Sequence, residues 1–542
     1  MNIHLVALNA SFMHVNLALR QIQQSLPKAV DVRIHDLHIN LPFRQIFDVL
    51  VREKPDVIGF STYIWNAAYV FRLCRALRRA LPDVILVLGG PEVSVEPEET
   101  LIKLPEVDFV LSGEGEITVP RLMEALMSGD VQSIQSMPGI AYRDGGHVVT
   151  NRPPDTMPPE LWPDVWENGT QGLEKRILYT ETSRGCPYRC SFCLSGSAGN
   201  VRALSAEESI KRLTNMADHG VQLIKLVDRT FNFDKARANA IWRGLIEHSK
   251  KRGLLPTYHF EISAQLLDDA AFEVLKDAPR SLFQFEAGIQ SSDDNVLSNV
   301  GRRVSFVQLR KPLTSVMALN AIHLHVDLIA GLPGETMETF EKSFDDAYSI
   351  GAERLQLGFL KLLRGSKLRN ESNALGIVYE PDPPYQVIRT RGLSVEELGV
   401  ISDIEHALDW YYNTERYGMT LGYLLQTRTP FELFLDIARK LRNHPSRPLF
   451  YQQSEKTRAS LLLELYDDEK LRMVMTHDML TCSRRRDLPE ALVFQEDEEL
   501  RLALKEKYHP VRGQSAFRYA FDVTAFEQTG EWIEQETVIL YD

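Results

Sequence analysis

The chain has 542 residues, of which 44% are hydrophobic and 25% are charged. That composition is ordinary for a soluble globular protein, and the length exceeds what one hydrophobic core can organise, so we expect about three domains. The formal net charge of −13 argues against a general nucleic-acid-binding surface, which needs clustered lysine and arginine. The sequence shows neither a signal-peptide pattern nor an apolar stretch long enough to span a membrane. We therefore expect a cytoplasmic protein with no membrane or nucleic-acid partner.

Residues 1–142 alternate apolar strands with amphipathic helices. Near-continuous apolar strands between helices indicate a parallel, doubly wound sheet of the Rossmann or flavodoxin-like type. Ligands of such sheets bind beyond the carboxyl ends of the strands, where two glycine-bearing turns are expected here. These turns are Gly89-Gly90-Pro91-Glu92 and Gly113-Glu114-Gly115-Glu116. The predicted strands are 3–8, 32–36, 57–61, 84–88 and 109–111.

Three further regions follow. Residues 143–176 are rich in glycine and proline pairs and are predicted to be a linker that packs across a domain boundary. Residues 177–375 alternate strands and helices again, as in a partial (β/α)6 barrel, whose active site is expected at the carboxyl ends of the strands. Residues 376–542 are predicted to be mostly helical and to help shape or cover the substrate pocket. The predicted barrel strands are 177–180, 223–227, 258–261, 282–286, 323–329 and 354–359.

A three-cysteine loop follows the first barrel strand. Cys186, Cys190 and Cys193 have the spacing C-x3-C-x2-C, and three thiolates can bind three irons of a [4Fe–4S] cluster while the fourth iron keeps an open position. A structural zinc loop is the alternative, but it needs four ligands that usually come as C-x2-C pairs. The two remaining cysteines, Cys74 and Cys482, are far away in sequence and isolated. The pattern therefore predicts an iron–sulfur cluster.

This spacing, with Phe192 just before the last cysteine, resembles that of the radical SAM superfamily over about residues 177–370. The stretches 286–291 and 327–335 also resemble it, most closely in the branch that contains oxygen-independent coproporphyrinogen dehydrogenase and the cobalamin-dependent enzymes. The resemblance implies reductive cleavage of S-adenosylmethionine (SAM) to methionine and a 5′-deoxyadenosyl radical. It implies SAM contacts from Phe192, Asp228, Glu261, Gln290, Arg302 and Asp327.

Three of these assignments leave alternatives open. Glu286 competes with Glu261, and Arg303 lies beside Arg302. The glycine-rich motif that the family places after the second strand, for backbone contacts to SAM, is replaced by Val227-Asp228-Arg229-Thr230.

The two glycine turns resemble those of the B12-binding domain that precedes many radical SAM domains. The alternative is a flavodoxin-like sheet in which the glycines only make turns. The D-x-H-x-x-G loop that supplies a histidine to cobalt elsewhere is missing, which implies base-off cobalamin without a histidine ligand. The implied cobalamin contacts are Ser61, Thr62, Tyr63, Gly89, Gly90, Pro91, Glu92, Gly113, Glu114, Gly115 and Glu116.

The loop 61–66, Ser-Thr-Tyr-Ile-Trp-Asn, would then meet the lower face of the corrin. Its aromatic residues have an alternative role, which is packing under the following helix. Together with the helical C-terminus, this loop resembles a subgroup of B12-binding radical SAM proteins with a C-terminal domain of unknown function (DUF4080).

Three functional hypotheses follow, and no catalytic residue is assigned. The first is methylation of an unactivated carbon or phosphorus centre in a small molecule or peptide. The second keeps both cofactors but ends in rearrangement or in transfer of another SAM-derived group. The third is a radical SAM enzyme whose N-terminal sheet is an empty scaffold that recruits a partner. The resemblance also implies an electron donor such as flavodoxin or ferredoxin.

Overall fold

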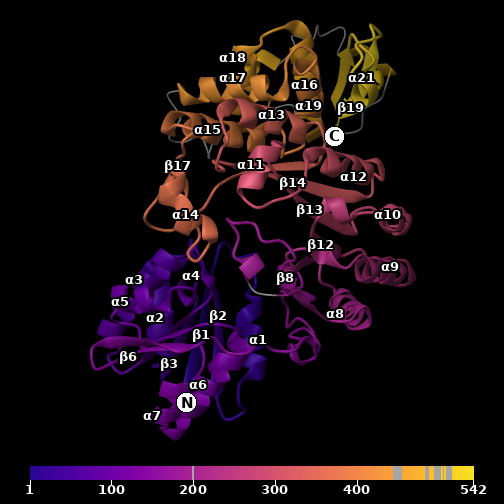
Figure 1. Cartoon of the computed structure of the whole chain (residues 1–542). Coiled ribbons are helices and arrows are strands. Elements are labelled where there is room, and N and C mark those ends of the chain that lie inside the picture. Colours follow the sequence, from indigo (N-terminus) through magenta and orange to yellow (C-terminus); the bar gives the residue numbers. More distant parts are fainter. Residues whose placement is uncertain are drawn as a thin grey trace.

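The computed structural model describes residues 1–197, 200–443, 454–482, 488–492, 502–503, 506–507 and 515–541. Figure 1 shows the N-terminal sheet domain at one end, a second sheet with helices along its outer side in the middle, and a mostly helical region at the other end. No helix in the described ranges is long and apolar enough to cross a membrane. The predicted α/β fold class is confirmed.

Residues 1–150, all of which are described, form one sheet with the strand order β2-β1-β3-β4-β5-β6-β7. The first five strands are parallel, which confirms the doubly wound sheet. Helices α1 (Leu17–Ser25) and α6 (Gly115–Ser128) cover one face, and α2 (Phe43–Arg52) and α3 (Ala67–Ala80) cover the other. The parallel strands are β1 (Asn2–Asn9), β2 (Asp31–His38), β3 (Val57–Ser61), β4 (Ile85–Gly89) and β5 (Phe109–Leu111).

The N-terminal domain extends beyond the boundary predicted at residue 142. Strands β6 (Ile140–Asp144) and β7 (His147–Thr150) form an antiparallel hairpin that continues the sheet. Gly145 and Gly146 at its turn have φ values of +53° and +90°, so the glycine pair that suggested a linker makes a hairpin turn instead. The connection to the barrel therefore begins only after Thr150.

The second sheet is the predicted partial barrel. Its strand order is β15-β14-β13-β12-β11-β8, and all neighbouring strands are parallel. Helices α8 (Ala206–Asp218), α9 (Lys235–Arg252), α12 (Phe306–Ala318) and α13 (Met337–Tyr348) contribute buried apolar residues to its core. The strands are β8 (Ile177–Thr180), β11 (Leu223–Leu226), β12 (Thr257–Ile262), β13 (Phe283–Gln290), β14 (Ile322–Ala330) and β15 (Arg354–Phe359).

Side chains on the barrel strands alternate strictly. On β13, Phe283, Phe285, Ala287 and Ile289 are buried, whereas the residues between them are only half-buried. The same alternation runs along β14, where the half-buried positions include His323, His325 and Asp327. Since side chains of a strand point to opposite faces in turn, the apolar set packs under the helices and the polar set faces the barrel lumen.

The C-terminal region packs on the outside of the barrel. Phe340 and Phe344 of α13 contact Phe431 of α17 (Pro430–Arg442), with ring centroids 6.1 and 6.0 Å apart. The other helices described here are α15 (Val395–Tyr411), α16 (Gly418–Leu424), α18 (Glu455–Leu465) and α19 (Glu469–Cys482). A hairpin of β18 (Ser515–Tyr519) and β19 (Thr537–Tyr541) follows in the predicted mixed tail. The described part of this region is therefore mostly helical, as predicted.

Candidate functional site

The cysteine loop begins where β8 ends. Cys186, Cys190 and Cys193 are half-buried free thiols. The Cys193 backbone N–H donates to the Cys190 carbonyl at 3.1 Å, and the Ser195 N–H donates to the Cys193 sulfur at 3.4 Å. Burial raises the pKa of the Cys190 thiol, and the neighbouring Arg302 guanidinium opposes that rise. Three sulfurs on one short loop, with an amide donor and a guanidinium beside them, suit an anionic metal–sulfur cluster.

A buried carboxylate holds the start of this loop. Asp228, which follows β11, is fully buried, and one of its oxygens accepts the Thr182 backbone N–H at 2.8 Å. Its other oxygen accepts the hydroxyls of Thr182 and Ser183, both at 2.6 Å. The predicted SAM contact at Asp228 can therefore involve only its backbone, because the side chain is fully engaged in positioning the loop.

Three other predicted SAM residues, Glu261, Gln290 and Asp327, lie on the lumen side of neighbouring strands, whereas Phe192 lies in the cysteine loop and Arg302 in the loop before α12. Glu261 of β12 is in register with Glu286 of β13, and Asp327 of β14 is in register with Gly288. Gln290 ends β13 with φ = +70°, and the Arg302 guanidinium donates to the Gly288 carbonyl.

Several polar atoms of this group lack a partner. Gln290 Oε1, Arg302 Nε and Asp327 Oδ1 are buried without a hydrogen-bond partner among the described residues. Burial, followed by the charges of Glu286 and Glu261, raises the pKa of Asp327 to about 8. Buried polar groups are normally satisfied, so unpaired atoms that converge at one place indicate a polar ligand.

A cleft of about 580 Å³ separates the N-terminal domain from the barrel mouth. The N-terminal side contributes Tyr63 and Trp65, whose rings stack with centroids 4.3 Å apart. The barrel side contributes Arg229 and Glu261, which form an ion pair at 3.3 Å. The loop predicted to meet a corrin thus faces a predicted SAM residue across one cavity. Among the described residues, those that line this cleft lie between positions 9 and 261.

His14 also lines this cleft. Its Nδ1 lies 2.7 Å from the Tyr179 hydroxyl, within hydrogen-bond distance. This histidine therefore bridges the two domains.

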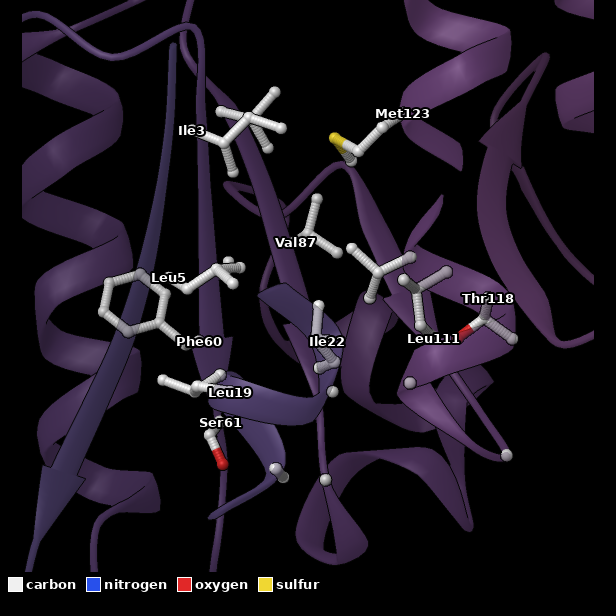
Figure 2. Close-up of a pocket in the computed structure, with 18 of the residues that line it drawn as sticks. Ile3, Leu5, Leu19, Ile22, Phe60, Ser61, Val87, Leu111, Thr118 and Met123 are labelled. Carbon is white, nitrogen blue, oxygen red and sulfur yellow. The ribbon is translucent and has the colours of Figure 1, made fainter. Parts of the chain in front are cut away.

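A second, narrower cavity of about 150 Å³ runs inside the N-terminal domain, between the sheet and helices α1 and α6. Figure 2 shows its apolar walls, which include Ile3, Leu19, Ile22 and Met123. Its other lining residues include Ser61, Tyr63, Gly89, Gly90, Gly113 and Gly115 of the predicted cobalamin set. Tyr63 lines both cavities.

Two of these glycines lie so close to other atoms of the chain that no side chain would fit. Gly90 has φ = +106°, and a Cβ there would lie 2.5 Å from the Thr62 carbonyl oxygen. Gly113 has φ = +86°, and a Cβ there would lie 2.5 Å from the Pro154 ring. Any other residue would clash with backbone or ring atoms and strain the turn. The glycine turns therefore shape the cavity directly.

The acidic residues of the two turns pair with side chains from other parts of the same chain. Glu114 accepts from Arg202 at 2.5 Å and from Arg184 at 3.1 Å, and Glu116 pairs with Arg184 as well. Glu92 accepts the Tyr385 hydroxyl at 2.5 Å. These predicted cobalamin contacts thus tie the N-terminal domain to the barrel and to the segment that follows it, while Pro91 begins the short helix α4 (Pro91–Ser94).

Family comparisons match all three parts of the chain. Residues 3–123 match the family model of the B12 binding domain, and residues 180–347 match the radical SAM superfamily. Residues 373–530 match a protein family of unknown function (DUF4080). The chain belongs to the B12-binding radical SAM proteins.

Two similar relatives of this B12-binding radical SAM protein are methyltransferases. The 2-(S-pantetheinyl)-carbapenam-3-carboxylate methyltransferase of Streptantibioticus cattleyicolor is 26% identical over 66% of this chain and 54% of its own length. The cobalamin-dependent radical SAM methyltransferase TokK of Streptomyces tokunonensis is 29% identical over 57% of this chain and 47% of its own. The chain therefore spans about half the length of these relatives.

Among solved structures, the cobalamin-dependent SAM radical enzyme OxsB with aqua-cobalamin and SAM bound matches with a TM-score of 0.63. The two chains are 17% identical, and the match covers 94% of this chain and 83% of that one. At this identity the likeness shows the fold.

Sequence reasoning missed the residues that join the domains of this B12-binding radical SAM protein. Arg184, Arg202 and Tyr385 carry no motif, and their partners lie 68 to 293 residues away. It also missed the polar lumen below the SAM residues, where Lys225, His259 and His325 surround Glu286. The polar residues at alternate positions of β13 and β14 were the available signal for this cluster.

We predict that Asp228→Asn weakens the cluster loop. Losing the charge that accepts three hydrogen bonds should lower the free energy of unfolding by about 1.5–3 kcal/mol, the usual range for hydrogen bonds to a charged group. Iron bound per chain after anaerobic reconstitution should fall in parallel. Asp277→Asn, at an exposed position on the same domain, serves as the control. Unchanged stability and iron content would contradict the role assigned to Asp228.

We predict that Arg184→Met destabilises the packing of the two domains by about 3–5 kcal/mol, because it leaves buried carboxylates without their cation. Burial opposes ionisation of Glu114, but hydrogen bonds from Arg202 and the Met157 amide, with the charge of Arg184, lower its pKa overall. A lowered pKa stabilises the fold above the unfolded carboxyl pKa, so the difference between wild type and variant should shrink below about pH 4.

Thermal unfolding from pH 7 down to pH 3 measures this difference. Arg79→Met, at an exposed helix position, is the matched control. A difference that does not depend on pH would contradict the ion-pair explanation.

Proposed function

We propose that this protein is a cobalamin-dependent radical SAM methyltransferase that acts on an unactivated carbon or phosphorus centre of a small molecule or peptide. The observation that carries the proposal is the cleft in which Tyr63 and Trp65 of the B12-binding domain face Arg229 and Glu261 of the barrel. When bound, the cluster supplies the electron for SAM cleavage and the corrinoid carries the transferable methyl group. An external one-electron donor of the flavodoxin or ferredoxin class would reduce the cluster.

In this proposal the chain's own residues bind and orient SAM. Cys186, Cys190 and Cys193 hold three irons and leave one iron open for a chelating ligand. The Arg302 guanidinium, whose Nε lacks a partner among the described residues, suits the carboxylate of a methionyl group. The Glu261 carboxylate can accept ribose hydroxyls. Because the pKa of Asp327 is about 8, its carboxyl is largely protonated at neutral pH and can donate a hydrogen bond as well as accept one.

The N-terminal cavity fits the detached base of a base-off cobalamin. Apolar cavities of about 150 Å³ accommodate a benzene-sized aromatic ring, and this cavity has that volume and apolar walls. It shares Tyr63 and Ala18 with the cleft, so a ligand that enters both would pass the loop 61–66. The missing histidine motif and the apolar cavity therefore support the same binding mode.

We predict that the purified protein, reduced by dithionite and methyl viologen under anaerobic conditions, converts SAM to 5′-deoxyadenosine and S-adenosylhomocysteine together. Cys190→Ala should abolish the cluster absorbance and reduce SAM cleavage to background, because two thiolates do not hold the cubane. Cys482→Ala, at an exposed position at the end of α19, is the control. Formation of 5′-deoxyadenosine alone would exclude methyl transfer, and cleavage at full rate in Cys190→Ala would overturn the proposal.

We predict that Ile22→Trp lowers cobalamin binding. The larger side chain would fill the narrow cavity beside Gly115, whose neighbourhood Ile22 already occupies. Corrinoid bound per chain after anaerobic reconstitution should fall more than about tenfold, since about 1.4 kcal/mol of lost contact gives that factor. Ile102→Trp, at a residue 66% exposed in the same domain, should bind normally. Normal corrinoid content in Ile22→Trp would exclude this cavity as the base site.

A further inference from the structure

Three potential metal ligands converge in the barrel lumen, in a layer that the proposed chemistry does not use. They are His259 of β12, Glu286 of β13 and His325 of β14, and one ligand atom from each lies within 4.8 Å of the others. Glu286 and His325 are direct partners in the strand register, and His259 Nε2 lies 3.0 Å from Glu286 Oε2. Three adjacent parallel strands thus present one ligand each to the same point.

The donor set has the composition of a transition-metal site. Two imidazole nitrogens and one carboxylate oxygen bind zinc or iron(II), and a site with three protein ligands keeps a further position open. His259 is 3% exposed, and its Nδ1 is buried without a hydrogen-bond partner among the described residues. The nitrogen 3.0 Å from Glu286 is Nε2, so Nε2 is the atom that would bind the ion, and the unpaired Nδ1 is a separate desolvation cost.

Neighbouring side chains can orient these ligands. The Gln284 side-chain amide lies 2.8 Å from His325 Nε2 and 3.3 Å from His325 Nδ1, and the amide can present either its nitrogen or its oxygen to the ring. Its oxygen would accept the ring N–H of His325 and leave the other ring nitrogen for the metal, which is the usual arrangement of metal-bound histidine.

The charges around the site include both signs. Lys225 Nζ lies 3.7 Å from Glu286 Oε2 and competes with a cation for that carboxylate, and Arg354 also acts on His325. The opposing negative charges are those of Glu286 and the nearby Glu261. Lys225 lines the cleft as well, so this layer borders the cleft.

We propose that His259, Glu286 and His325 bind a divalent transition-metal ion of the zinc or iron(II) class in the barrel lumen. This ion is separate from the cysteine-bound cluster, and its binding does not depend on the proposed methyl transfer. A site with three protein ligands would leave a coordination position for an oxygen or nitrogen atom of a further ligand.

The test uses cluster-loaded protein, so that the three cysteines are already occupied, with zinc chloride as the probe. After removal of excess zinc, wild type should retain about one zinc per chain, as expected for one three-ligand site. His259→Asn, Glu286→Gln and His325→Asn should each weaken zinc binding more than about tenfold, since even residues that only orient a ligand cost that much. His219→Asn is the matched control, because it changes an exposed histidine of the same domain outside the triad.

A second measurement separates lost binding from lost folding. Zinc should raise the thermal midpoint of wild type and of His219→Asn, but not that of the three ligand variants, because only a ligand that binds the native state stabilises it. Absence of retained zinc in wild type, or equal retention in all variants, would overturn the proposal. Neither result bears on the proposed function, which is measured separately as SAM cleavage that depends on Cys190.

Discussion

Arg184 lies two residues before the first cysteine of the cluster loop, and its guanidinium binds carboxylates from both sides of the cleft. Glu181 belongs to the same loop, at 2.5 Å, whereas Glu114 and Glu116 belong to a glycine turn of the B12-binding domain. All four side chains are 15% exposed or less. A buried charge must be paired. Separation of the loop and the turn would therefore expose these charges to solvent or leave them buried without a partner. This one cluster of ion pairs sets how the predicted cobalamin side of the site faces the predicted cluster side.

The barrel follows a different constraint, the strict alternation of side chains on parallel strands. The outward set, such as Phe283 and Phe285 on β13, is buried under the helices and supplies the stability of the domain. The inward set, such as Glu286, His325 and Asp327, is polar and only partly satisfied. Desolvated polar groups without partners lower the free energy of unfolding. The lumen therefore destabilises the fold but leaves polar groups available to bind a ligand. Binding of SAM and of a metal ion at two depths of the lumen would each recover part of that cost.

Much of the architecture follows from local patterns. The C-x3-C-x2-C spacing, the apolar strands and the glycine turns led to the two α/β domains in the correct order, and the family comparisons match both of them. The prediction was wrong at Gly145 and Gly146, where glycines that suggested a linker make a hairpin turn within the sheet. The carboxylates of Glu92, Glu114 and Glu116, from which it expected cobalamin contacts, bind Tyr385, Arg202 and Arg184, respectively. A local pattern cannot distinguish an acidic residue that meets a ligand from one that meets a distant arginine.

The sequence by itself determined the ligand chemistry of the cysteine loop, because three thiols within eight positions converge whatever surrounds them. It also determined the order of strands and helices, because half-buried strands and helices repeat their apolar residues with different periods. Only the tertiary structure decided which polar residues act together: Tyr63 with Glu261 across the cleft, and His259 with Glu286 and His325 in the lumen. These residues come from separate strands and loops, and their proximity depends on strand register and on the buried ion pairs between domains. Neither of those leaves a periodic or spaced signal in the chain.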